Sequence, residues 1–162
     1  MKIQNITEID MSNGMGIRTV LWVSGCSHKC KGCHNPQTWD PDSGVDYNEE
    51  IERMLFDALS ASFIKGITFS GGDPLYPGNR DAVGQIIEKV HNNFPNKDIW
   101  LYTGYLWEEI KDLPYIKYVN VLVDGEFHIN EKDPLLPFAG SRNQRVINVT
   151  KTLEEGQIIL YC

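Results

Sequence analysis

The sequence lacks any long apolar segment. None of its 162 residues lies in an apolar run that approaches the roughly 20 residues needed to cross a bilayer as a helix. The first ten residues, Met-Lys-Ile-Gln-Asn-Ile-Thr-Glu-Ile-Asp, lack the apolar centre of a signal peptide. We therefore expect a cytoplasmic protein that does not contact a membrane.

The sequence has fewer positive than negative charges. Fifteen lysines and arginines stand against 22 aspartates and glutamates, for a net charge of −7, so direct binding of nucleic acid is not expected.

There is no internal repeat, low-complexity tract or linker, and glycine and proline are scattered along the chain. The length and a hydrophobic content of 41% predict a single domain over residues 1–162 with a real core.

Cysteine is scarce, but it is concentrated. Three of the four cysteines, Cys26, Cys30 and Cys33, fall within eight residues in a C-x3-C-x2-C pattern. Disulfides are disfavoured in a reducing cytoplasm, so such a group indicates metal binding or catalysis. Cysteine thiolates are the usual ligands of a cubane iron–sulfur cluster, which has four irons. The missing fourth cysteine leaves one iron without a protein ligand, and an open coordination position of this kind can bind a cofactor.

Zinc is the alternative occupant of the cysteine group. A zinc ion could be held by the three cysteines together with His28, His34 or Cys162. Structural zinc sites favour two separated ligand pairs, whereas these cysteines are crowded together. The crowding favours a cluster and leaves zinc open. Cys162 is the last residue, and we expect it to be an incidental thiol.

Apolar segments of two kinds alternate along the chain. Amphipathic spacing predicts three helices, the first with Asp46 as its N-cap, and β-branched or aromatic runs predict four strands with two further candidates. Such alternation predicts an α/β fold with a mostly parallel, curved sheet, and the units are too few for a closed eight-fold barrel, so we expect an incomplete (βα) barrel. The predicted helices are 47–62, 81–94 and 106–111; the strands are 18–24, 66–69, 99–102 and 119–123, then 146–149 and 158–161.

Glycine-rich or polar turns follow four of the predicted strands. Ligands of parallel α/β folds bind at the carboxyl ends of the strands, so these turns should meet on one rim. Paired glycines allow a backbone to approach a ligand closely, and Asp73 adds a carboxylate suited to an ammonium group. Asp124 could bond ribose hydroxyls or form a simple Asp-Gly turn. The turns are the cysteine loop, Ser70-Gly71-Gly72-Asp73, Thr103-Gly104 and Asp124-Gly125.

Taken together, these motifs resemble the radical S-adenosylmethionine superfamily. Within it, the sequence is most similar to the activating proteins of anaerobic (class III) ribonucleoside-triphosphate reductases. The resemblance runs in order from about residue 14 to residue 150. The matching segments are Gly14–Val20, Val23–Cys26, Thr68–Leu75, Trp100–Tyr105, Val121–Gly125 and Phe138–Arg145.

The resemblance implies a cofactor site. Cys26, Cys30 and Cys33 would bind a [4Fe–4S] cluster, and S-adenosylmethionine would chelate its unique iron. The implied contacts to the cofactor's amino group come from the loop that begins at Ser70. Those to its adenosyl part come from Gly32 and His34. Thr103 and Asp124 are further candidates for cofactor contacts on the rim. The residues assigned to the amino group are Gly71, Gly72 and Asp73, the last standing where the wider superfamily usually has glutamate.

The resemblance also implies a reaction and its partners. The enzyme would reductively cleave S-adenosylmethionine to methionine and a 5′-deoxyadenosyl radical. That radical would take hydrogen from a glycine of the large subunit of the anaerobic ribonucleoside-triphosphate reductase, and an electron donor such as reduced flavodoxin would supply the electron. Two other functions stay open: a radical S-adenosylmethionine enzyme acting on a small molecule, and a zinc-binding interaction module.

Overall fold

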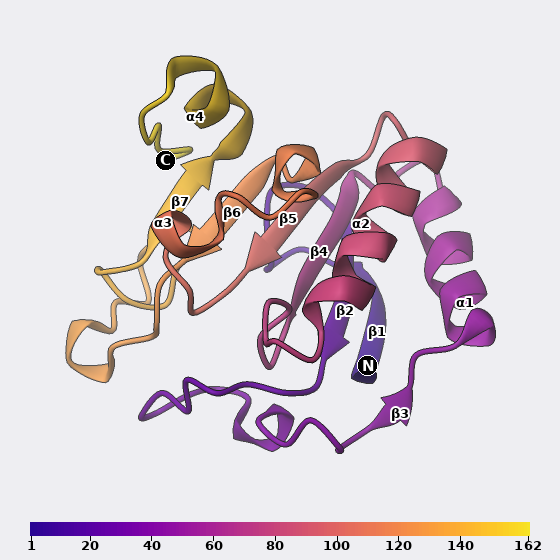
Figure 1. The fold of residues 1–162 in the computed structure, drawn as a ribbon, viewed down its shortest axis with the longest axis horizontal. Helices are drawn as coiled ribbons and strands as arrows, with labels where there is room; N and C mark the ends of the chain where they lie inside the picture. Colours follow the sequence, from indigo (N-terminus) through magenta and orange to yellow (C-terminus); the bar gives the residue numbers. More distant parts are fainter.

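The computed structural model describes all residues from 1 to 162, arranged around one seven-stranded sheet (Figure 1). The strand order is β3-β1-β2-β4-β5-β6-β7, so the sheet is open, with β3 and β7 at its edges. Strands β2, β4, β5 and β6 are parallel, whereas β1 and β7 run antiparallel to their neighbours. The strands are β1 (Lys2–Asp10), β2 (Arg18–Val23), β3 (Val45–Asp46), β4 (Gly66–Gly71), β5 (Asp98–Tyr102), β6 (Val121–Asp124) and β7 (Arg145–Asn148).

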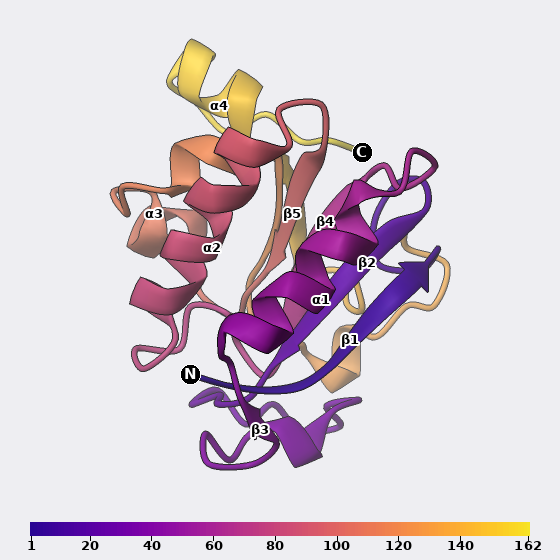
Figure 2. The same cartoon turned by 90° about the vertical axis from the view of Figure 1, so that its right-hand side faces the viewer.

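Helices connect the parallel strands and lie on one side of the sheet. Figures 1 and 2 show α1, α2 and α3 together on that side. They lie in the connections from β2 to β4, from β4 to β5 and from β5 to β6. None of the helices is long and apolar enough to span a membrane. Their bounds are α1 (Glu49–Ser60), α2 (Arg80–Asn93), α3 (Trp107–Ile110) and α4 (Val149–Glu155), with short 3-10 turns η1 (Pro36–Thr38), η2 (Ile116–Tyr118) and η3 (Ile129–Glu131).

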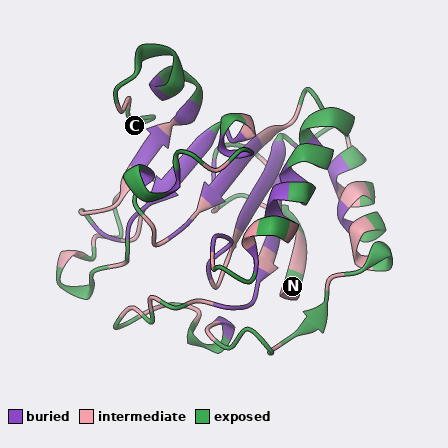
Figure 3. Ribbon diagram, in the orientation of Figure 1, coloured by how far each residue is buried: buried purple, intermediate pink, exposed green.

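The core forms because side chains of a strand alternate between the two faces of the sheet. On β4 and β5, Ile67 and Leu101 belong to the main cluster of 23 buried residues, which they share with the buried sides of α1 and α2. Trp100, between Ile99 and Leu101, belongs instead to a smaller cluster with Val121, Val123 and Val146. Figure 3 shows the resulting distribution, with buried central strands and exposed outer helix surfaces.

The expected α/β architecture with a largely parallel central sheet is confirmed. Two local expectations were wrong. Asn48, not Asp46, caps α1, because its Oδ1 accepts hydrogen bonds from the backbone of Glu50 and Ile51 at 3.0 Å. Residues 158–161 form no strand and contribute only an isolated bridge between Leu160 and Ile147. The strand expected at 146–149 is confirmed as β7, which runs antiparallel to β6 and ends at Asn148, the N-cap of α4.

Candidate functional site

The cysteine loop begins where β2 ends and is tied to the segment that follows it. The backbone amide of Gly25 donates to the carbonyl of Thr38 at 2.7 Å, and that of Cys26 donates to Trp39 at 3.1 Å. Gly25 and Gly32 have φ values of 100° and 77°, a region that glycine occupies readily. These bonds fold the loop back under the carboxyl ends of the parallel strands (Figure 1).

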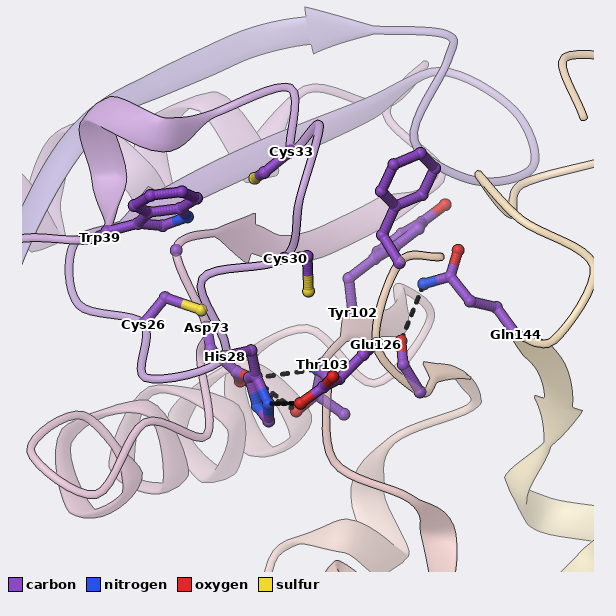
Figure 4. Close-up of a pocket in the computed structure, with 14 residues that line it drawn as sticks. Cys26, His28, Cys30, Cys33, Trp39, Asp73, Tyr102, Thr103, Glu126 and Gln144 are labelled. Atoms are coloured by element: carbon purple, nitrogen blue, oxygen red, sulfur yellow. Dashed lines mark hydrogen bonds and ion pairs between the residues drawn. The ribbon is translucent and has the colours of Figure 1, made fainter. Parts of the chain in front are cut away.

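Cys26, Cys30 and Cys33 all line one pocket (Figure 4). The pocket has a volume of about 130 Å³ and opens to solvent. Burial raises the pKa of the Cys26 and Cys30 thiols, so both are neutral until a metal displaces their protons. No three Cys, His, Asp or Glu side chains converge on a point where they could hold one metal ion. A zinc ion needs such convergence, whereas a cubane distributes its cysteine ligands over separate irons.

Gly71 and Gly72 allow the end of β4 to lie against the start of the cysteine loop. A Cβ on Gly71 would stand 2.5 Å from the carbonyl oxygen of Val23. One on Gly72 would stand 2.5 Å from the carbonyl oxygen of Gly25 and 2.8 Å from that of Thr38. The backbone of Asp73 then donates to Gly25 at 2.7 Å. This close packing brings the two loops to a single rim.

Asp73 is the buried carboxylate of this rim, with a side chain that is only 1% exposed. Its Oδ1 accepts a hydrogen bond from the backbone of Leu75 at 2.8 Å, and its Oδ2 accepts one from Gly104 at 3.0 Å. The hydroxyl of Thr103 donates to both oxygens, at 2.9 and 3.1 Å. The loops that follow β4 and β5 therefore hold the carboxylate in one orientation.

His28 crosses the pocket from the middle of the cysteine loop. Its Nε2 lies 2.9 Å from Asp73 Oδ2, and its Nδ1 lies 2.8 Å from Glu126 Oε1. The neighbouring carboxylates, Asp73 first and then Glu126, raise the pKa of His28 to about 9. A carboxylate faces each ring nitrogen, and the contact of Nδ1 with Glu126 is a hydrogen bond, whereas that of Nε2 with Asp73 is an ion-pair contact. His28 thus joins the cysteine loop to residues that follow β4 and β6.

The structure brings together only some of the residues expected at the site. Cys26, Cys30, Cys33, Gly72, Asp73 and Thr103 line the pocket. Ser70, Gly71, Gly32, His34 and Asp124 do not.

Two of the residues outside the pocket have other neighbours. Asp124 is fully buried, and its carboxylate accepts hydrogen bonds from the backbone of Trp107 at 2.8 Å and from Nε of Arg145 at 3.0 Å. The ring of His34 lies 5.9 Å from that of Phe127.

Sequence reasoning overlooked a smaller part of the pocket wall. Glu126 directly follows the Asp124-Gly125 turn, so the same strand-end argument could have found it. His28 had been considered only as a zinc ligand. Trp39 and Phe127 carry no comparable signal. Gly104 and Gly125 belong to turns that were expected on the rim, and both line the pocket.

The residues present fit an iron–sulfur cluster with an amino-acid-like cofactor. Three thiols supply the cluster's ligands, and the carboxylates of Asp73 and Glu126 line the same pocket. A second hollow of about 400 Å³ shares the lining residues His28, Cys30, Glu126 and Phe127 with the first, so the two hollows lie on either side of the same residues. Soft sulfur ligands next to hard oxygen acceptors suit a cluster and its organic cofactor better than a single ion.

Comparison with known proteins agrees with this donor set. Residues 12–147 match the family model described as a 4Fe-4S single cluster domain. A protein of Enterobacteria phage T4 is 44% identical over 146 residues, which cover 90% of this chain and 93% of the relative. A Vibrio cholerae protein is 44% identical over 146 residues, covering 88% and 94%, and an Escherichia coli protein is 41% identical over 142 residues, covering 85% and 92%.

The fold and the site thus define a protein of the 4Fe-4S single cluster class. All three relatives bear the name anaerobic ribonucleoside-triphosphate reductase-activating protein. The chain belongs to this family of activating proteins.

Proposed function

We propose that the chain is the activating enzyme of an anaerobic ribonucleoside-triphosphate reductase. The observation that carries the proposal is the pocket at which Cys26, Cys30 and Cys33 meet the buried carboxylate of Asp73. Family membership supports the same assignment. One continuous sheet supports treating residues 1–162 as a single domain, and four free cysteines suit a reducing cytoplasm.

Each group of pocket residues has a role in the proposal. Cys26, Cys30 and Cys33 hold the [4Fe–4S] cluster, while Gly72 and Asp73 face the amino group of S-adenosylmethionine. When bound, the cluster and S-adenosylmethionine supply a one-electron reductive cleavage that yields methionine and a 5′-deoxyadenosyl radical. The chain holds the cofactor beside Thr103 and limits the access of water from the protein side.

The second substrate in this proposal is a protein. The radical's hydrogen donor is a glycine in the large subunit of the reductase, which becomes a glycyl radical. The pocket supports this choice because it is small and open, whereas a site for a free metabolite usually encloses most of its ligand. An electron donor such as reduced flavodoxin completes the proposed reaction by reducing the cluster.

The test is installation of the glycyl radical. Protein purified and reconstituted without oxygen should contain about four irons per chain and form 5′-deoxyadenosine when reduced with S-adenosylmethionine. Mixed with the reductase, it should produce a glycyl radical signal in electron paramagnetic resonance. Cys30→Ala should lose the signal, because the cluster then lacks a ligand.

Cys162→Ala provides the matched control. Cys162 is exposed and does not line the pocket, so its loss should leave both iron content and radical yield unchanged. A Cys30→Ala enzyme that still installs the radical would rule out the proposal. Turnover of S-adenosylmethionine with a metabolite, without any reductase complex on a sizing column, would favour the small-molecule alternative instead.

A further inference from the structure

His28 stands midway between Cys26 and Cys30, and its ring is one of the most enclosed parts of the cysteine loop. The side chain is 11% exposed, although it belongs to a loop on the rim of the molecule. Its two nitrogens lie 2.9 Å from Asp73 and 2.8 Å from Glu126. Figure 4 shows the ring beneath the cysteine loop, between these two carboxylates.

The loop that follows β5 forms the seat of the ring. A Cβ on Gly104 would stand 2.5 Å from Cδ2 of His28 and 2.7 Å from its Nε2, so only glycine leaves room for the imidazole. The ring of Tyr105 meets it edge-on, with the centroids 4.6 Å apart. His28 therefore contacts the loops that follow β4, β5 and β6 at the same time.

These contacts bridge segments that are far apart in the sequence. His28 and Glu126 are separated by 98 positions, and His28 and Asp73 by 45. Closing such a separation costs chain entropy, which specific contacts must offset. Of the cysteine loop's side chains, His28 alone makes ion-pair contacts with the rim.

We infer that His28 is a positioning residue that clamps the cysteine loop onto the strand-end rim. It holds the segment from Cys26 to Cys30 over the pocket whether or not a cluster is bound. The inference deepens the proposed function, on which it rests, because the cysteines are positioned for the cluster they are proposed to bind. It gives Asp73 a second task, that of anchoring the loop.

Hydrogen exchange measured by mass spectrometry tests the clamp directly. The full-length chain would be studied without oxygen, before and after reconstitution with iron and sulfide. In the cluster-free protein, His28→Ala should speed exchange in residues 24–35 by about tenfold or more, as the loss of the hydrogen bond to Glu126 and of the ion-pair contact with Asp73 predicts. The protected amides there include those of Gly25, Cys26 and Cys33.

Two further variants separate a clamp from a general loss of stability. Gly104→Ala keeps the imidazole but fills its seat, so it should loosen the same segment. His28→Gln keeps an amide donor for Asp73 and should restore part of the protection. His128→Ala is the matched control, because His128 also lies 2.9 Å from a glutamate, Glu131, but outside the three-thiol pocket.

The pattern of exchange decides the outcome. Faster exchange confined to residues 24–35 in His28→Ala and Gly104→Ala, with partial rescue by His28→Gln, supports the clamp. Wild-type exchange in His28→Ala, or an equal increase across β2, β4 and β5, overturns it. The cluster-free exchange measurement involves neither S-adenosylmethionine nor the reductase. The clamp can therefore fail this test while the radical assay succeeds, and the radical assay can fail while the clamp passes.

Discussion

Position 72 has no space for a side chain, so a single added methyl group tests the packing of the site. Gly72→Ala would place a Cβ 2.5 Å from one carbonyl oxygen and 2.8 Å from another, both in rigid backbone. We expect a loss of about 1–3 kcal/mol in the free energy of unfolding, measured by urea denaturation. The cysteine loop should also retain less iron after reconstitution.

Gly156→Ala is the comparison for this change. Gly156 has φ 68° with nothing within 4 Å of its would-be Cβ, so alanine there meets strain but no collision. Its cost should be about 1 kcal/mol, with normal iron content. If Gly72→Ala proved no more harmful than Gly156→Ala, the close packing of the two loops would not limit the site.

Residue roles were predictable from the sequence where a spacing rule exists. Cys26, Cys30 and Cys33 follow such a rule, and Asp73 stands in a recognisable turn. His28 follows none, because its partners are brought to it only by the folded sheet. Asp124 shows the converse: its place at a strand end suggested either a ligand contact or a simple Asp-Gly turn, whereas the folded chain directs its carboxylate to Arg145 and Trp107.

Among the elements, β6, β7 and α3 are joined by one ion-pair network. Arg145 on β7 contacts Asp124 at the end of β6 and also Glu108 on α3, 2.9 Å away. Both carboxylates raise the pKa of Arg145, with the hydrogen bond to Asp124 the larger cause. Arg145→Ala would leave the buried Asp124 charge unpaired, so we expect a loss of about 3 kcal/mol in unfolding free energy, measured by urea denaturation.

Glu108→Gln tests the exposed arm of the same network. The Glu108 side chain is 56% exposed, so solvent already screens its contact with Arg145. The change should cost less than about 1 kcal/mol. Equal losses for Arg145→Ala and Glu108→Gln would show that the buried arm does not dominate the network.

The elements were predictable where apolar spacing was regular. The central strands and the two long helices follow from that spacing. Strand β1 was not predicted because its isoleucines, Ile3, Ile6 and Ile9, lie three residues apart and do not alternate with a period of two. Two register shifts in its pairing with β2 accommodate this spacing. Helix α4 is only seven residues long, too short for a periodic signal.

Across the whole molecule, the core is separate from the site. None of the 23 residues of the main cluster is a cysteine, and the pocket residues lie at the strand ends. The cluster-free chain should therefore keep its secondary structure and unfold cooperatively in urea, as followed by circular dichroism. Reconstitution should raise the midpoint, because the cluster binds the folded chain preferentially.

A disordered cluster-free chain would contradict this expectation. Small zinc modules behave in that way, because metal binding supplies their folding free energy. Cooperative unfolding of the iron-free chain, with a lower midpoint, would instead match a chain that folds without its cofactor and gains stability when the cofactor binds. Anaerobic preparation with and without iron provides both samples from the same chain.

The placement of the site on strand-end loops has a consequence for how this family can diverge. Every residue lining the three-thiol pocket lies in a connecting segment or at the last position of β5, and none lies in α1, α2 or α3. The surfaces of those helices that face away from the sheet are exposed to solvent (Figure 3). Substitutions there can accumulate over generations without touching the chemistry, while the rim stays under selection.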